Sequence, residues 1–96
     1  MSDPISAADF QSLPNREIAA AFGGADVVLE VVEVRTFAPT PFRVEPFSVT
    51  LRHNGANQHV PQGTYTFRHP TRGALPLFTH PRGPDGKGMC YELIFN

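Results

Sequence analysis

The sequence predicts an all-β fold, a small antiparallel sandwich or partly closed barrel of about six strands with a short N-terminal helix. Composition is the first reason: the 96 residues include ten prolines and eight glycines, which disfavour long helices and favour short strands joined by turns. The second reason is that apolar and polar residues alternate between turn signals along most of the chain. Hydrophobic residues make up 41% of the chain, enough for a core, and the length fits one domain over residues 1–96.

The N-terminal segment, residues 5–14, is predicted to contain the short helix. Ser6 and Asp9 have the spacing of a capping box, in which the two residues satisfy free backbone groups at the start of a helix. Phe10 and Leu13 then fall on one helix face, and the proline directly after Leu13 ends the helix. We therefore expect a docking helix that lays two apolar anchors across one end of the sheet.

Two strands are predicted next, at Arg16–Phe22 and Val27–Phe37, with a glycine-rich turn between them. In the second strand the inward phase of the alternation slips by one residue at Val31–Val32. A β-bulge or a sharp bend explains such a slip. Because bulges bend strands, this one would let a small sheet curl toward closure.

The rest of the chain predicts four more strands, divided by turns such as Asn54-Gly55. Pro76 has no N–H to donate, which predicts a sheet edge or a strand start at that position. Residues 81–88 are predicted to form a long glycine-rich hairpin loop. The last strand ends beside the C-terminus and needs pairing to be ordered, so we expect it inside the sheet. The four strands are Phe47–Arg52, Gln62–Arg68, Leu75–Phe78 and Tyr91–Phe95.

The net charge of −1 hides an uneven distribution. Residues 1–42 carry six acids and two arginines, whereas residues 43–96 carry three acids, five arginines and one lysine. One interpretation is that the two halves interleave in the fold and their charges mix. The other is an acidic face and a basic face, which would suit an anionic partner or head-to-tail self-contact.

Nothing in the sequence predicts an enzyme, a metal site or a bound cofactor. Cys90 has apolar neighbours and no adjacent base, which indicates a buried strand thiol, and a single cysteine excludes an internal disulfide. No serine lies in a Gly-x-Ser-x-Gly elbow, and residues 83–88 lack the hydroxyl residue of a phosphate-binding loop. The four histidines share no metal-binding spacing: His53, His59, His69 and His80.

The start of the chain has no basic segment typical of a secretory signal, and the longest apolar run, Ile18–Phe22, is too short to span a membrane. We therefore expect no membrane insertion. The expected location is the cytoplasm, or a phage-like or extracellular assembly into which the chain is incorporated.

The candidate contact surface is the segment from Phe37 to Phe42, in which two aromatic residues flank Pro39 and Pro41. A loop cannot easily bury both rings, so these four residues are expected to contact a partner. The expected function is that of a non-enzymatic structural or accessory protein that acts through protein–protein contacts or self-association.

The alternative is a module that binds a small anionic ligand or a nucleic acid. It would use the basic segment 52–82, which holds four of the arginines and no acid. The net charge and the single lysine argue against nucleic acid in particular. The candidate residues of this alternative are Arg52, Arg68, His69 and Arg72.

Three stretches together resemble a family of small bacterial domains of unknown function. They are Phe47–Arg52, residues 62–81 with the pattern QGTY…HPxxGxLxLFxxP, and residues 91–96 with the pattern YExxFN. The resemblance extends from Phe10 to Asn96, with Pro14-Asn15 where the family has a glycine. It implies proximity to phage-tail-collar-like fibre proteins, and hence a structural or accessory role, and it implies no catalytic residue.

Overall fold

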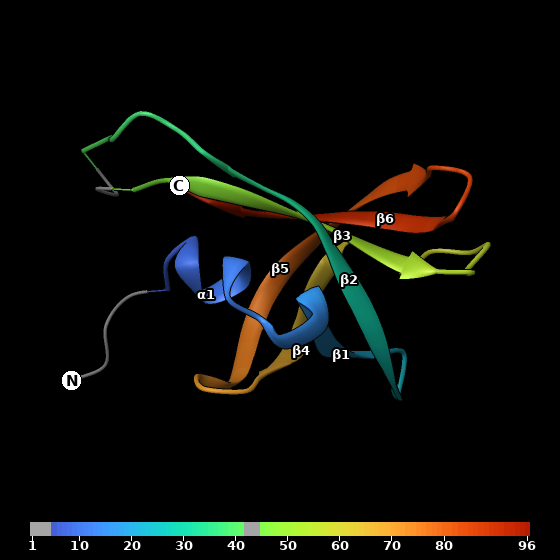
Figure 1. The fold of residues 1–96 in the computed structure, drawn as a ribbon. Helices are drawn as coiled ribbons and strands as arrows, with labels where there is room; N and C mark the ends of the chain where they lie inside the picture. Colours follow the sequence, from blue (N-terminus) through green and yellow to red (C-terminus); the bar gives the residue numbers. More distant parts are fainter. Residues whose placement is uncertain (1–4, 42–44) are drawn as a thin grey trace.

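The computed structural model describes residues 5–41 and 45–96, and these form a closed antiparallel β-barrel (Figure 1). Around the barrel the strand order is β1-β2-β3-β6-β5-β4, and β4 pairs with β1 to close it. The all-β prediction is confirmed, and of the two expected architectures the barrel is the one observed. The strands are β1 Glu17–Phe22, β2 Ala25–Thr36, β3 Phe47–Asn54, β4 Gly63–His69, β5 Gly73–Pro84 and β6 Gly88–Phe95.

The phase slip predicted in the second strand is a β-bulge. β2 and β3 pair Val31 with Leu51 and then Glu33 with Thr50, so Val32 is the extra residue. Before the bulge the odd-numbered residues of β2 face the core, and after it the even-numbered residues do. The bulge thus keeps one apolar face inside while the strand bends from one wall of the barrel to the next.

The C-terminal strand lies inside the sheet, as predicted. β6 pairs along its whole length with β3, from Gly88 opposite Asn54 to Phe95 opposite Phe47, and its other side pairs with β5. The pairing between β1 and β4, which closes the barrel, is much shorter. β1 and β4 share only two register pairs, at Ala19 and Ala20.

Prediction and structure differ at β5, which is longer than the Leu75–Phe78 strand expected from the sequence. The expected loop over residues 81–88 is accordingly reduced to a turn at residues 85–87 between β5 and β6. The prolines of β5 are tolerated because the strand changes partner along its length. Residues 73–79 pair with β4 and residues 79–84 with β6, so Thr79 alone has register partners on both sides. Pro76 is therefore at a local edge within a closed barrel, which refines the predicted edge position.

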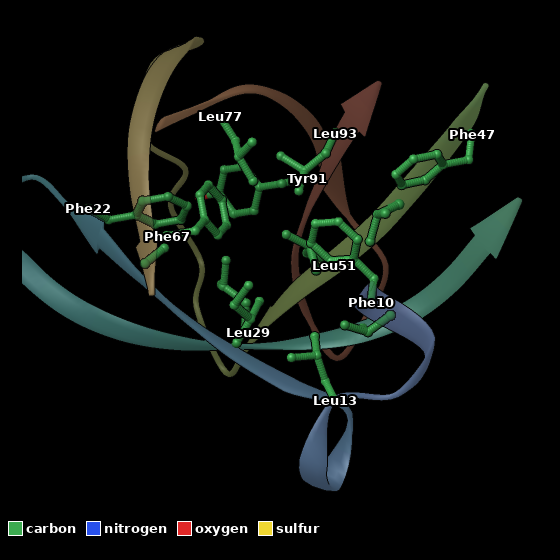
Figure 2. Close-up of a cluster of buried hydrophobic side chains, with 14 of the residues drawn as sticks. Phe10, Leu13, Phe22, Leu29, Phe47, Leu51, Phe67, Leu77, Tyr91 and Leu93 are labelled. Carbon is green, nitrogen blue, oxygen red and sulfur yellow. The ribbon is translucent and has the colours of Figure 1, made fainter. Parts of the chain in front are cut away.

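The predicted helix over residues 5–14 is shorter in the structure. It consists of one turn of α-helix, α1 (Ala8–Gln11), followed by a 3₁₀ turn, η1 (Pro14–Arg16). One half of the predicted capping box forms, because the Ser6 N–H donates to Asp9 Oδ2 at 2.9 Å. The docking function is confirmed: Phe10 and Leu13 are buried on the side of the barrel where α1 lies (Figures 1 and 2).

The core contains two aromatic groups. At one end Phe22 packs against Tyr65, Phe67 and Tyr91, with ring centroids 5.0 to 6.3 Å apart. At the other end the ring of Phe10 lies against those of Phe47 and Phe95, which stack on each other at 4.4 Å. Figure 2 shows the separation, with Phe22 and Phe67 on one side and Phe10 and Phe47 on the other. α1 thus fills the end of the barrel that the strands leave open.

The turn after Leu13 contains an unusual backbone. Asn15 and Arg16 have φ angles of 55° and 56°, the left-handed region that glycine adopts most easily. Asparagine is one of the few other residues that enters this region readily. Asn15 therefore adopts the left-handed conformation at the place after Leu13 where the resembling family has a glycine.

Candidate functional site

The predicted contact segment leaves the barrel at the end of β2. Residues 37–41 are all exposed, and 49% of the Phe37 side chain is accessible to solvent. The Phe37 N–H donates to the Pro46 carbonyl at 2.9 Å, so the segment starts from a hydrogen-bonded position of the β2–β3 ladder. In Figure 1 the chain continues beyond the body of the barrel over residues 37–41. Pro39 and Pro41 are exposed as expected, whereas Phe42 lies outside the described residues.

Two further exposed apolar side chains belong to the same end of the molecule, and sequence reasoning did not single them out. Phe78 of β5 and Ile94 of β6 are 48% and 47% exposed. Because Thr79 pairs with Leu93 in an antiparallel ladder, Phe78 and Ile94 are neighbours on the outer wall. Their position outside the barrel follows from the alternation of their strands, since Leu77 and Leu93 point inward. We call Phe37, Phe78 and Ile94 the outer apolar residues.

The four residues of the alternative binding site do not converge. Arg52 is on β3 and Arg68 on β4, which are three strands apart in either direction around the six-stranded barrel. Both side chains point outward, so they project from opposite walls. Only His69 and Arg72 come together, at the end of β4 beside α1.

Arg52 is at the centre of a polar network at the β3–β6 end. Its guanidinium donates to Glu30 and Asp85, each at 2.9 Å, and its Nε donates to Asn54 Oδ1 at 2.6 Å. Backbone N–H groups, first that of Lys87, and then the Arg52 guanidinium lower the pKa of Asp85 far below its usual range. Two carboxylates therefore already neutralise the Arg52 charge.

His69 and Arg72 bind α1 rather than facing solvent. His69 is buried, and its Nε2 lies 2.6 Å from the Asp9 carbonyl oxygen. Its Nδ1 accepts the backbone N–H groups of Thr71 and Arg72, each at 3.2 Å, so the hydrogen is on Nε2. Arg72 forms an ion pair of 3.0 Å with the Asp9 carboxylate. These contacts attach the helix to the β4–β5 turn.

The ion pairs show that the two charge halves interleave. Arg52 pairs with Glu30, Arg68 with Asp26 and Arg72 with Asp9, and each pair joins the basic half to the acidic half. A fourth pair links Arg82 to Glu92 across β5 and β6 at 3.4 Å. The first interpretation of the uneven charge, that the fold mixes it, is the one the structure supports.

The remaining candidate chemistry is dispersed. Within residues 5–41 and 45–96, no three His, Cys, Asp or Glu side chains gather closely enough to hold a metal ion. Cys90 is buried, and burial, followed by the neighbouring Asp85 carboxylate, raises the pKa of its thiol. None of the described helices has the length and apolar character needed to cross a membrane.

The described residues form hollows at two places on the surface. One, of about 330 Å³, opens between α1, η1 and β2 and is lined by Phe10, Gln11, Arg16, Val31 and Val34. The other, of about 420 Å³, lies beside the β5–β6 turn and is lined mostly by glycine, alanine and proline residues, with Asn57 and Lys87. Neither of these hollows combines a nucleophile with a base among its lining residues.

Comparison with known proteins gives one match. Neither the curated proteins nor the solved structures include one that matches the chain. A family model, described as Domain of unknown function (DUF6916), matches residues 5–95, which include α1 and all six strands. The chain therefore belongs to the DUF6916 family of domains of unknown function.

Proposed function

We propose that this protein is a non-enzymatic binding domain that contacts another protein through the apolar segment Phe37–Pro41. The observation that carries the proposal is the exposure of Phe37 at the start of a proline-containing segment, residues 37–41, that projects from a closed barrel. A half-exposed phenylalanine on a small domain leaves a large apolar area in water, and its burial against a partner is favourable.

The two prolines make the segment suitable for recognition. Pro39 and Pro41 restrict the backbone before any partner binds, so less conformational entropy is lost on association. Phe37 is itself held at its backbone by the hydrogen bond to Pro46. An apolar side chain that is held in place in this way is suited to a partner with an apolar groove or pocket.

Phe78 and Ile94 extend the proposed contact surface onto the barrel wall. In register, Ser48 separates Ile94 from Arg35 of β2, two residues before Phe37. Phe37 directly follows β2, Ile94 is on β6 and Phe78 is on β5, and β2, β3, β6 and β5 are consecutive strands of one curved wall. A partner that binds Phe37 could also cover this wall.

The finer form of the proposal is that the partner belongs to a phage-tail-like or fibre assembly. It is supported by the resemblance of residues 47–52, 62–81 and 91–96 to a family near phage-tail-collar-like proteins. Sedimentation of particles from the native host tests it: the chain should co-sediment with the assembly and should be absent from the particle fraction when the fibre genes are deleted.

The contact itself is tested with a photo-reactive amino acid placed at Phe37 and, separately, at Val28. Val28 is a matched control because it is also an exposed apolar residue, at 56%, but it lies near the start of β2, whereas Phe37 follows the end of that strand. A discrete adduct with one host protein is expected from position 37 and not from position 28. Phe37→Ser should then reduce recovery of that protein about tenfold while Val28→Ser leaves it unchanged. Equal adducts from both positions, or none from position 37, would contradict the proposal.

A further inference from the structure

We propose that the second half of β2 is a self-complementary strand edge through which two copies of this chain form a symmetric dimer. This inference goes beyond the proposed function and does not depend on it, because it concerns the backbone of residues 33–36 and not the Phe37 side chain. It rests on the register of β2, on the direction of its backbone groups and on the order of its charges.

The register leaves this half of β2 paired on one side only. β1 covers β2 from Ala25 to Glu30, whereas β3 continues from Glu30 to Thr36. Among the described residues, no strand therefore lies beside residues 33–36 on the side opposite β3. η1 contacts β2 at the bulge, where Arg16 donates to the Val32 carbonyl at 3.3 Å, and α1 packs inside the barrel against Val31 and Val34. The edge beyond Val32 is left open, next to the hollow lined by Val31 and Val34.

The backbone groups that point to this edge can be identified. The Phe37 N–H donates to Pro46 on the β3 side, and the groups of successive residues in a strand point to opposite sides. Glu33 and Arg35 therefore direct their backbone groups toward β3. Val34 and Thr36 direct theirs toward the open edge, where a strand edge can recruit another strand.

A second copy fits this edge about a two-fold axis at Val34. In an antiparallel pair centred there, the two Val34 residues exchange two backbone hydrogen bonds, as a hydrogen-bonded pair requires. Glu33 of each copy then lies opposite Arg35 of the other. A two-fold axis produces both of these opposite-charge pairs at once, which is the property of an isologous interface.

The charges of Glu33 and Arg35 are available for this pairing. Both residues are exposed, and neither forms an ion pair with any described residue. Four other arginines each pair with a carboxylate within the chain: Arg52, Arg68, Arg72 and Arg82. Arg35 thus differs from them. In the proposed dimer, Glu33 of the second copy would supply the carboxylate that lies opposite Arg35.

The mass in solution tests the dimer. Sedimentation velocity and light scattering over a wide range of protein concentration should show the mass rise from the 10.5 kDa of one chain toward twice that value. A mass that remains at one chain over the whole range would overturn the proposal. Because the contact is short, we expect a weak, concentration-dependent dimer.

Charge reversal tests the register. Glu33→Arg alone, or Arg35→Glu alone, places like charges opposite each other twice and should weaken dimerisation at least about tenfold. The double variant E33R/R35E restores opposite charges and should dimerise like the wild type. An equimolar mixture of the two single variants should form a heterodimer, since each copy then carries the charges that the other lacks.

Matched control variants distinguish an effect of charge at this edge from a general effect of net charge. Asp26→Arg, at the opposite end of β2, and Lys87→Glu make the same changes in net charge at exposed positions away from the edge, and should leave the dimer intact. Dimerisation that is insensitive to reversal at residues 33 and 35 would overturn the proposal. If it is lost instead in Phe37→Ser, self-contact occurs through the apolar segment. A failure of the edge dimer leaves the contact of Phe37 with a host protein unaffected, because the photo-adduct at position 37 reports that contact separately.

Discussion

The ring of His69 is hydrogen-bonded to the backbone carbonyl of Asp9, with 2.6 Å between Nε2 and the oxygen. The two residues are 60 positions apart in sequence. Arg72 binds the carboxylate of the same aspartate, so side chains from the β4–β5 region attach α1 at two points. Beneath these contacts Phe10 packs against Phe47 and Phe95. The polar contacts therefore hold in place the apolar anchor that fills this end of the barrel.

Asp9→Asn should destabilise the fold at neutral pH and much less in acid. Burial by itself would raise the pKa of Asp9, but the Ser6 N–H and the Arg72 guanidinium outweigh it and hold the pKa below its ordinary value of 3.8. The carboxylate therefore stabilises the fold above the unfolded pKa, and this contribution is lost as the pH falls through the folded pKa. We expect a loss of about 1–2 kcal/mol at pH 7.

Urea unfolding followed by circular dichroism at pH 7 and at successively lower pH measures the effect. Asp26→Asn is the control, because Asp26 and Arg68 form an ion pair of 3.5 Å with both side chains mostly exposed. Such a pair contributes little, so this variant should behave like the wild type at every pH of the series. An Asp9→Asn deficit that persists unchanged in strong acid would contradict the explanation.

Gly88→Ala should be severely destabilising. A Cβ at this position would press against the carbonyl oxygen of His53 and would lie 2.9 Å from the Cα of Asn54. Both obstacles are backbone atoms of β3, which cannot move without breaking the β3–β6 ladder. We expect a loss of about 3 kcal/mol or more in the free energy of unfolding.

Gly63→Ala is the matched substitution on another strand. Its Cβ would meet only a ring carbon of Tyr65, at 3.9 Å, which is an ordinary contact. Thermal and urea unfolding of both variants should show a large loss for Gly88→Ala and a change within about 1 kcal/mol for Gly63→Ala. Equal stabilities of the two variants would contradict the expectation that the β3 backbone leaves no space for a Cβ at position 88.

Arg52→Gln should lower the melting temperature without altering the affinity for anions. The substitution leaves Glu30 and Asp85 without the guanidinium that joins them. Fluorescence anisotropy with single-stranded oligonucleotides and with anionic glycans measures binding directly. We expect no salt-sensitive binding to the wild type. Binding that declines steeply with salt and is weakened in both Arg52→Gln and Arg68→Gln would instead favour the anionic-ligand function.

The local features of this barrel could be read from neighbouring residues. Alternation located the strands, and the repeated phase at Val31–Val32 located the bulge, because a side chain's face depends only on its position along its own strand. The spacing of Phe10 and Leu13 similarly predicted their burial. The exposure of the segment that begins at Phe37 was predictable as well, since the two prolines that follow Phe37 keep the rest of that segment out of a ladder.

Strand partners could not be read in this way. β5 extends far beyond its predicted end because its prolines fall where only one neighbouring strand is present. That arrangement depends on how β4 and β6 are staggered. The open edge at residues 33–36 has the same origin, because β1 has half the length of β2.

The sequence by itself determined that this chain is all-β, which residues face the core, where β2 bends and which apolar segment leaves the barrel. Only the tertiary structure decided which acidic side chain pairs with each arginine of the basic segment. Arg52, Arg68 and Arg72 form one basic segment in the sequence, yet three different acids from the first half of the chain neutralise them on separate parts of the surface. The physical reason is that hydrophobic periodicity is local, whereas an ion pair forms only after closure brings distant strands together.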